Sequence, residues 1–403
     1  MTKEHTPQDN ARTFWRPTGA SAYAIALVAL PGFLLGAFAP EIKEDLSFGD
    51  TELGAILTFG YLVSSIVMSI SGGVADRTGP KRVLRYGVAI ASLAAFLTGF
   101  LGNTFFLLMI FIGLNRVAEG IIHPATNTLI SSSVVLERQG IAMAAKQSAV
   151  PFATALAGFA VPTLGVVFGW KGTFCVVALL AFPAWFIIPN APTLSEKSSS
   201  SRREMWRLSH LQLLALAGAF SAAAVVTVSG FLTTSAKNAG YSDGSAGLIL
   251  GLGGVLMILS RLGWGYLADR YHFDRFKAVS GSLLIGSLAF VLFAIESKTS
   301  IAVGSIFIFG IGWSWPGLAL LGIIEHHRDE PGEATAIVQT SIRIGAMFAP
   351  LGFGLIADSF DYSYAWLCSL VSALLGGLFM VTLARVLEGG YNFLVFICNP
   401  LNL

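Results

Sequence analysis

Apolar runs about 20 residues long dominate this chain of 403 residues. The hydrocarbon core of a bilayer is about 30 Å thick, so a helix needs about 20 apolar residues to cross it. We therefore expect about twelve spanning helices. The predicted spans lie near residues 18–38, 52–74, 83–102, 105–133, 140–167, 171–189, 211–235, 244–268, 278–295, 300–323, 333–357 and 362–386.

The composition indicates a surface that meets lipid. The chain is 54% hydrophobic and only 12% charged, whereas a soluble domain has about 25% charged residues. The polar start of the chain, residues 1–19, lacks the short apolar segment and cleavage site of a signal peptide. We therefore expect the first apolar run to stay in the membrane.

One long polar segment, NAPTLSEKSSSSRREMWRLSH, divides the apolar runs into two sets of about six. We expect an all-α membrane protein with two pseudo-symmetric six-helix bundles. The predicted parts are a first bundle at 1–189, a cytoplasmic linker at 190–210, a second bundle at 211–386 and a tail at 387–403.

Basic residues set the expected orientation. Most of the 25 Lys and Arg lie in the N-terminus, the even-numbered loops and the C-terminus. Cytoplasmic loops of membrane proteins carry an excess of Lys and Arg. We therefore expect a multi-pass protein of the cytoplasmic membrane with both termini in the cytoplasm.

The two halves repeat each other. The segment DTELG at 50–54 corresponds to DGSAG at 243–247, and GGVADR at 72–77 corresponds to GYLADR at 265–270, in one register. Later, where the offset between the halves falls from 193 to 192 residues, Gln147 corresponds to Gln339. A shared register over so long a stretch indicates an internal duplication.

The segment SGGVADRTGPKR, residues 71–82, interrupts this apolar pattern after the second span. Gly72 and Gly73 would let the helix approach a neighbour closely. Asp76 lies at a helix end, where it can cap the helix or pair with bases of the other half. We predict a latch that opens when the two halves rock; the plain alternative is a basic loop that only sets topology.

The chain resembles the major facilitator superfamily along almost its whole length. The resemblance rests on Gly-x-x-x-Asp-Arg-x-Gly-x-Lys-Arg at 72–82, on its partial copy at 265–270 and on Arg-x-x-x-Gly at 116–120. It implies a transporter that works by alternating access. The implied gating residues are Gly72, Asp76, Arg77, Gly79, Lys81, Arg82, Gly265, Asp269 and Arg270.

Four basic residues fall deep inside predicted spans: Arg116, Lys146, Arg261 and Arg343. Glu119 is the one acidic residue at such depth. A charge at the bilayer centre costs about 2.5–3.5 kcal/mol, so the excess of positive charge needs a reason. We predict that an organic anion, a carboxylate, binds between the halves and supplies the missing charge.

Each basic residue also has a simpler interpretation. Arg261 resembles the helix-8 arginine of monocarboxylate and oxalate carriers, which implies contact with a substrate carboxylate, but it can also extend to the cytoplasmic face. Arg116 can be purely structural, paired with Glu119. The predicted substrate-binding residues are Arg116, Lys146, Gln147, Arg261, Trp313, Trp315, Gln339 and Arg343.

Proton coupling is predicted for Glu119 and His123, which share one helix face. The ordinary pKa of histidine lies near working pH, so His123 could exchange a proton with the neighbouring carboxyl group. A hydrogen-bonded structural histidine is the alternative. Trp313 and Trp315 would form flat amphipathic walls, or else only pack.

Several functions lack their sequence signals. No phosphate-binding GxxxxGK[ST] segment is present, so we expect no nucleotide. Cys175, Cys368 and Cys398 match neither a disulfide framework nor a metal-ligand spacing. The net charge of +2 is too small for a nucleic-acid partner. We expect a monomer without cofactor or metal, not an enzyme, whose partners are a small anion, protons and the bilayer.

Three other classes of function stay open. A drug/proton antiporter of the same superfamily carries Gly-Pro-x-x-Gly-Gly in its fifth helix, and KQSAVPFATALAG at 146–158 lacks that motif. A neutral-metabolite carrier predicts a cavity rich in Asn and Gln. A membrane enzyme or receptor needs a catalytic constellation or a soluble domain. The preferred prediction is secondary active, proton-coupled transport of a small organic anion.

Overall fold

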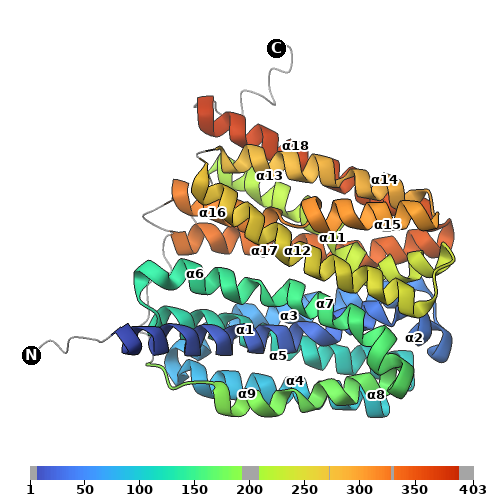
Figure 1. The fold of residues 1–403 in the computed structure, drawn as a ribbon, viewed down its shortest axis with the longest axis horizontal. Coiled ribbons are helices and arrows are strands. Elements are labelled where there is room, and N and C mark those ends of the chain that lie inside the picture. The colour runs from blue at the N-terminus through green and yellow to red at the C-terminus, as the bar shows by residue number, and fades with distance from the viewer. Residues whose placement is uncertain (1–6, 193–207, 272, 328–330, 390–403) are drawn as a thin grey trace, which may run out of the picture. The chain divides into compact units, whose positions relative to one another are not determined.

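The computed structural model describes residues 7–192, 208–271, 273–327 and 331–389. These residues are mostly helical, and no strand occurs among them (Figure 1). The chain divides into two compact units. The first unit comprises Met1–Phe48, Ala55–Lys197 and Ser242–Val255, and the second comprises Gly49–Gly54, Ser198–Tyr241 and Leu256–Leu403.

The first part of the chain forms nine α-helices among the described residues. They are α1 (Pro7–Ala37), α2 (Ala39–Leu46), α3 (Asp50–Thr78), α4 (Pro80–Leu101), α5 (Phe105–Ser133), α6 (Leu136–Gln147), α7 (Ala149–Ala160), α8 (Val166–Leu179) and α9 (Ala181–Ile187). A π-helical turn, Val161–Gly165, joins α7 to α8. The start of α3 belongs to the second unit.

The second part continues after the predicted linker, most of which lies outside the described residues, as does most of the predicted tail. Its helices are α11 (Ser209–Asn238), α12 (Asp243–Arg270), α13 (Arg275–Gly286), α14 (Leu288–Ala294), α15 (Lys298–Phe307), α16 (Trp315–His326), α17 (Pro331–Ser359) and α18 (Tyr362–Gly389). A second π-helical turn, Ile308–Gly312, precedes α16. The first half of α12 belongs to the first unit.

Eleven segments of the described chain are long and apolar enough to cross a membrane. The fifth, Arg138–Ile187, has 50 residues, which as a straight helix would measure about 75 Å. Gly169 interrupts it with φ 63° and ψ −178°, a conformation that suits glycine. The chain turns back there, so α6–α7 and α8–α9 run in opposite directions (Figure 1). This segment thus holds two of the predicted spans, and the predicted fold class is confirmed.

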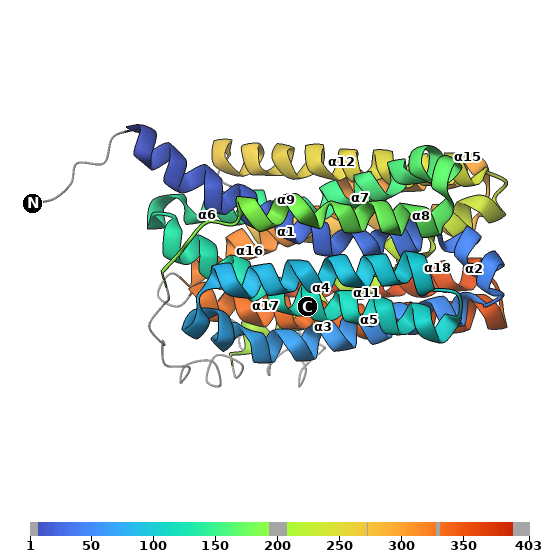
Figure 2. The same cartoon turned by 90° about the horizontal axis from the view of Figure 1, so that it is seen from below.

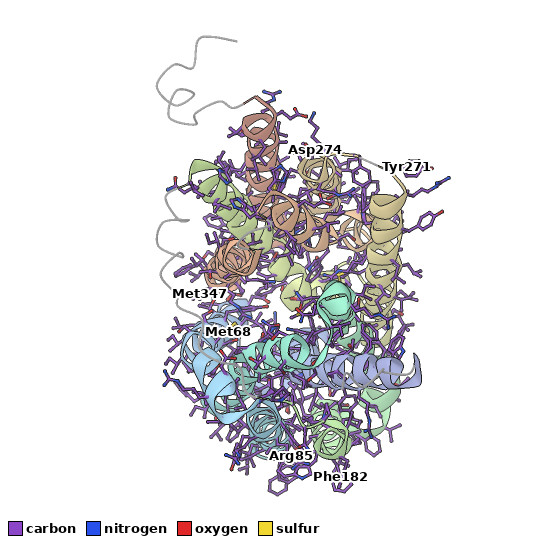
Figure 3. The ribbon with its side chains drawn as sticks, turned by 90° about the vertical axis from the view of Figure 1, so that its left-hand side faces the viewer. Met68, Arg85, Phe182, Tyr271, Asp274 and Met347 are labelled. Atoms are coloured by element: carbon purple, nitrogen blue, oxygen red, sulfur yellow. The ribbon has the colours of Figure 1, made fainter. Side chains whose placement is uncertain are left out.

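Large apolar side chains cover the outside of both units. Phe182 is 72% exposed and lies at the edge of the first unit (Figure 3). Phe100 and Leu262 are each 64% exposed. Apolar patches of this extent are rare on soluble proteins but are favourable against lipid tails. The exposed surface therefore supports the membrane assignment.

Small residues allow close helix packing in the first unit. The start of α12 lies against α7, and an added Cβ on Gly251 would come within 2.9 Å of the Phe159 ring. One on Gly254 would come within 2.4 Å of the backbone nitrogen of Ala155. Both glycines are therefore sites of close helix packing.

Each unit has its own buried core. In the first, α1 and α4 pack against α5, and Figure 2 shows α4 and α5 side by side. Alanines such as Ala24, Ala91 and Ala118 lie in this core. In the second, α11 packs against α17 and α18, and bulkier residues such as Phe276 and Trp315 fill a core. The first core, with its small side chains, brings the backbones around α5 close together.

Candidate functional site

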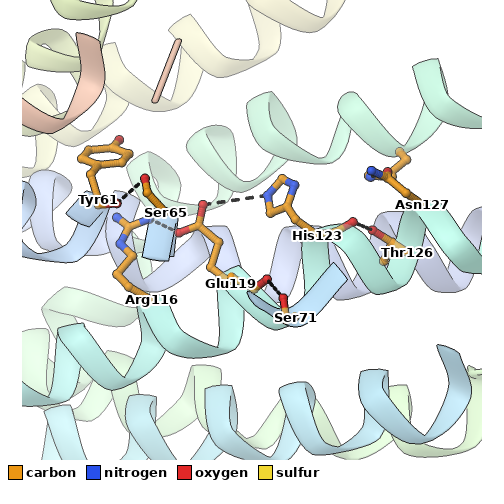
Figure 4. A network of polar contacts seen from close by, with 10 residues as sticks. Tyr61, Ser65, Ser71, Arg116, Glu119, His123, Thr126 and Asn127 are labelled. Atoms are coloured by element: carbon orange, nitrogen blue, oxygen red, sulfur yellow. Dashed lines mark hydrogen bonds and ion pairs between the residues drawn. The ribbon is translucent and has the colours of Figure 1, made fainter. Parts of the chain in front are cut away.

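The centre of the candidate site is a row of ionisable side chains on α5 (Figure 4). Arg116 Nη1 donates to Glu119 Oε2 over 2.6 Å, and both residues are buried. The other carboxylate oxygen, Glu119 Oε1, lies 3.8 Å from His123 Nε2. The spacing i, i+3, i+7 places all three on one helix face. Glu119 thus lies between two basic groups, and its predicted pairing with Arg116 is confirmed.

Two glycines make room for the Arg116 side chain. A Cβ on Gly32 of α1 would lie 2.1 Å from Arg116 Nη2, and one on Gly60 of α3 would lie 2.9 Å from Arg116 Cγ. Tyr61 completes the enclosure, since its ring centroid is 5.1 Å from Arg116 Cζ. A cation over an aromatic ring is stabilised by the ring quadrupole. The guanidinium is therefore held by packing and by charge together.

Gly120 explains the second half of the Arg-x-x-x-Gly motif. A Cβ there would come within 2.8 Å of Val67 Cβ and 2.9 Å of the Ser64 carbonyl oxygen. Ser71 donates a 2.7 Å hydrogen bond to the Gly120 carbonyl (Figure 4). The motif therefore couples a buried cation to close contact between α5 and α3.

Lys146 lies in the last turn of α6 and is 3% exposed. Its ammonium donates to the side-chain oxygen of Asn127 on α5. The described partner is a neutral amide, so this hydrogen bond satisfies a donor without cancelling the charge. Gln147 follows directly and is half-buried. The helix breaks at Ser148, where α6 gives way to α7.

The other predicted substrate residues belong to the second unit. Arg261 on α12, Gln339 and Arg343 on α17, and Trp313 are half-buried. Trp313 stacks on Phe309 with ring centroids 5.6 Å apart. Trp315 is 1% exposed within the core cluster, so packing is its observed environment. Substrate contact by these five residues stays a prediction.

Asp76 of the predicted latch accepts a 2.8 Å hydrogen bond from Thr128 of α5. Both residues belong to the first unit. Its counterpart Asp269 lies in α12, but its side chain is outside the described part of the structure. Pairing of either aspartate with the other half stays a prediction.

The glycines of the two motif copies differ in role. Gly79 separates α3 from α4 and has φ 89°, a value that a residue with a Cβ adopts only with strain. A Cβ on Gly73 or Gly265 would have no neighbour within 4 Å. The expected close helix approach at Gly73 is therefore wrong, because the residue faces open space.

The basic residues of the first motif, at 72–82, lie near the surface of the protein. Lys81 donates over 2.7 Å to the Asn190 side-chain oxygen. Arg77 and Arg82 are exposed, as is Arg270 in the second copy. Exposed bases at a helix end suit a loop that sets topology and leave the gating role a prediction.

Sequence reasoning missed a carboxylate cluster at the start of α3. Asp358 of α17 accepts hydrogen bonds from the backbone N–H groups of Asp50 (3.1 Å) and Thr51 (2.6 Å). The Tyr362 hydroxyl donates to Asp50 Oδ1 over 2.6 Å. These residues all belong to the second unit. The acidic residues at the N-terminus of α3 are a capping signal that the sequence shows. No local pattern in the sequence indicates that Asp358 lies beside them.

A second missed cluster joins α2 to α8. Lys171 Nζ lies 2.9 Å from Asp45 Oδ2, and Trp170 Nε1 donates to the same oxygen over 3.2 Å. The hydrogen bond from Lys171 holds the pKa of the Asp45 carboxyl below its ordinary value; burial opposes this effect, and the charge of Lys171 and the hydrogen bond from Trp170 add to it. The side chains of Lys171 and Asp45 are 37% and 44% exposed.

Helices that span a membrane, arranged in two units with a buried charge row, define a class of polytopic membrane transporters. A family model described as Major Facilitator Superfamily matches residues 22–329. The chain therefore belongs to the major facilitator superfamily, whose members are transporters and not enzymes.

Curated relatives carry several names. An MFS-type efflux pump of Mycolicibacterium smegmatis is 26% identical over 66% of this chain and 65% of its own length. A probable sugar efflux transporter of Haemophilus influenzae is 24% identical over 82% of this chain and 87% of its own length. The sialic acid transporter NanX of Escherichia coli is 23% identical over 69% of this chain and 70% of its own length. The chain thus spans slightly less than two thirds of the first of these relatives.

Solved structures share the fold. A bacterial homologue of the human lysosomal transporter Spinster, in an inward-facing and occupied conformation, superposes with a TM-score of 0.77. The match covers 94% of this chain and 98% of the other at 14% identity. Similarity at this level establishes the architecture and leaves the substrate to the site.

Proposed function

We propose that this transporter moves a small organic anion, a carboxylate, together with protons across the cytoplasmic membrane. The observation that carries the proposal is the buried row on α5, in which Glu119 lies between Arg116 and His123. The proposal includes cytoplasmic termini, as the distribution of basic residues predicts.

The row suggests how protons and substrate are linked. While Glu119 is ionised, it neutralises the Arg116 guanidinium 2.6 Å away. A proton delivered by way of His123 would neutralise the carboxyl group and leave the guanidinium without a negative partner. A substrate carboxylate would then be favoured beside Arg116, because a buried cation needs a counter-charge. Proton and anion would therefore bind together, which is the requirement for symport.

Lys146 would add to the attraction for an anion. It is almost fully buried, and a positive charge in a medium of low dielectric constant attracts an anion over a distance. The name of the NanX relative is also in keeping with an anionic substrate, because sialic acid carries a carboxylate.

A second candidate function is efflux of neutral sugars or of other small molecules. Two of the relatives are named as efflux proteins, one of them for sugars. This alternative predicts binding of uncharged solutes and little dependence on the buried basic residues.

Binding measurements on purified protein separate the two functions. We expect Arg261→Ala and Arg343→Ala to weaken carboxylate binding more than Lys146→Ala, because arginine can grip a carboxylate with two hydrogen bonds. Loss of one partner of a desolvated charge pair costs roughly 2–5 kcal/mol, which is about thirtyfold or more in affinity. Calorimetry with a panel of carboxylates and uncharged sugars gives the affinities directly.

Lys171→Ala is a matched control, since it removes a partly exposed charge that is bound to Asp45 outside the row. It should bind carboxylates as the wild type does. A wild type that binds uncharged sugars and no carboxylate would contradict the anion proposal and support the second candidate.

A further inference from the structure

Two histidines from distant parts of the chain meet at one end of the second unit. His210 lies at the start of α11, and His327, 117 residues further on, directly follows the end of α16. Their Nε2 atoms are 2.9 Å apart, and both residues are half-buried. Both belong to the second unit. Neither is part of the row on α5 or of the predicted substrate and gating residues, so the proposed function leaves this contact unexplained.

The geometry of the pair is that of a hydrogen bond between two rings. The ring centroids are 5.1 Å apart, and the ring planes differ by 17°. The centroids are farther apart than the facing nitrogens by nearly two ring radii, so the rings meet edge to edge and their Nε2 atoms point at each other. A metal ion held by both rings would need both nitrogens to point at a third position. The contact is therefore one that a shared proton makes.

The number of protons on the pair decides whether the contact forms. A neutral imidazole has a hydrogen on one nitrogen and a lone pair on the other, so one ring donates its Nε2–H to the bare Nε2 of the other. One added proton makes the donor a cation and strengthens the hydrogen bond. After a second added proton, both Nε2 atoms carry hydrogen and the two cations repel each other. The pair thus holds while at most one ring is charged and separates when both are.

The charges that act on His210 come from histidines. They are those of His327 and of the exposed His326. His326 Nδ1 lies 2.9 Å from the Gly322 carbonyl oxygen, and its ring centroid is 5.5 Å from that of Phe276. His326 is therefore held by contacts of its own, and its positive charge in acid adds to the repulsion within the pair.

Other ionisable residues lie at the same ends of the neighbouring helices. Arg275 of α13 pairs with Glu325 of α16 over 3.4 Å, and Lys277 of α13 pairs with Glu388 of α18. The remaining ones are Arg385 on α18 and four residues whose side chains lie outside the described part of the structure, Arg328, Asp329, Glu330 and Glu333. The ordinary pKa of histidine is about 6.5 and those of carboxylic acids are about 3.9–4.3, so the histidines are the groups that titrate just below neutral pH.

We propose that His210 and His327 form a pH-sensitive contact that holds the end of α16 to the start of α11 at neutral pH and releases it in acid. The pair responds to the pH on the side of the membrane where α11 begins, which the orientation in the proposed function makes the cytoplasm. Each unit of such a transporter moves largely as a rigid body, so acid on that side loosens a part that has to move as one. The contact does not depend on which substrate the protein carries.

Nitrogen-15 NMR of the histidine-labelled full-length protein in detergent tests the shared proton. The chain has six histidines, so signals are assigned by their loss in His210→Gln and His327→Gln. At pH 8 we expect one ring of the pair to carry its hydrogen on Nε2 and the other on Nδ1. On titration to pH 5 the two added protons should bind in steps separated by about one pH unit or more. Two identical tautomers, or one common step near pH 6.5, would overturn the proposal, as would signals that change when a chelator removes metal ions.

Hydrogen exchange at the end of α16 tests the release. After correction for the pH dependence of free amides, exchange there should be about fivefold faster at pH 5 than at pH 7.5, because one hydrogen bond is lost. In His210→Gln the amide can donate to a neutral His327 and accept from a charged one, so we expect slow exchange at both pH values. In His210→Ala no partner remains, and we expect fast exchange at both.

His326→Gln is the matched control, because it removes the adjacent histidine and leaves the pair intact. It should retain the acceleration in acid. The proposal is wrong if His210→Gln accelerates in acid as the wild type does, or if His210→Ala exchanges as slowly as the wild type at pH 7.5. Loss of the acid response in His326→Gln alone would assign it to the wrong histidine and would equally overturn the proposal.

Discussion

Replacement of Gly32 by alanine should disrupt the buried charge row without touching a charged residue. The added Cβ would lie 2.1 Å from Arg116 Nη2 and 2.9 Å from Arg116 Cζ, so the guanidinium has to move. Gly60 borders the side chain on α3, and Tyr61 covers the guanidinium. The movement should therefore break the 2.6 Å bond to Glu119.

The cost follows from the burial of the pair. Separating one partner of a buried ion pair costs about 3–5 kcal/mol. Alanine in place of a helical glycine returns about 0.5–1 kcal/mol. We expect Gly32→Ala to lower the free energy of unfolding by about 2–4 kcal/mol. Equilibrium unfolding in mixed detergent micelles measures this difference.

Two comparisons isolate the cause. Gly19→Ala, on the same helix, adds a Cβ with nothing within 4 Å and should be neutral or slightly stabilising. In an Arg116→Ala/Glu119→Gln background no guanidinium remains to be displaced, so Gly32→Ala should cost little there. If Gly32→Ala were as neutral as Gly19→Ala, or equally costly in that background, the described role of Gly32 would be refuted.

Three further predictions concern residues at or near helix ends. Asp76→Asn should slow transport but leave substrate affinity within a few-fold, because its described partner Thr128 is not one of the predicted substrate residues; abolished binding in a direct titration would contradict this. Gly79→Ala should lower the midpoint of thermal unfolding, because its φ of 89° strains any residue with a Cβ; an unchanged midpoint would argue against strain. The pKa of Asp45 is lowered in the folded protein, so its contact with Lys171 stabilises the fold at any pH above the ordinary pKa of about 3.9. This stabilisation is lost as the pH falls through the lower pKa of the folded state. Asp45→Asn should flatten this acid dependence slightly, as an unfolding series between pH 5 and pH 2 would show.

The sequence was sufficient for the fold class because the constraint from the bilayer is strong. Each apolar run must satisfy its own backbone hydrogen bonds, and a helix is the simple solution. Hydropathy alone does not show where a run reverses, however. The segment Arg138–Ile187 reads as one span of 50 residues, and its reversal depends on the backbone conformation of Gly169. The sequence analysis nonetheless predicted two separate spans here, at 140–167 and 171–189.

The row on α5 was predictable in part. The positions of Arg116, Glu119 and His123 follow from helical periodicity on a single helix. The glycines and Tyr61 that enclose Arg116 come from two other helices, and no local pattern connects them. Contacts between distant segments are set by tertiary packing, which a single sequence does not reveal.

Trp315 is a second case in which the sequence did not reveal the tertiary environment of a residue. Its neighbour Trp313 is half-buried, whereas Trp315 is 1% exposed in a core cluster. Trp313 follows the π-helical turn Ile308–Gly312 and Trp315 begins α16, so the two rings do not share one helical register. The sequence identified the aromatic pair but did not assign the two faces.

Uptake into proteoliposomes tests the central claim, proton-coupled transport of a carboxylate, most directly. Radiolabelled carboxylates would be offered with and without an imposed pH gradient, to the wild type and to Glu119→Gln. We expect the gradient to drive accumulation by the wild type, and we expect Glu119→Gln to equilibrate the substrate without accumulating it, because its amide cannot exchange the proton. Carboxylate uptake by the wild type that ignores the pH gradient, or accumulation by Glu119→Gln equal to that of the wild type, would contradict the account.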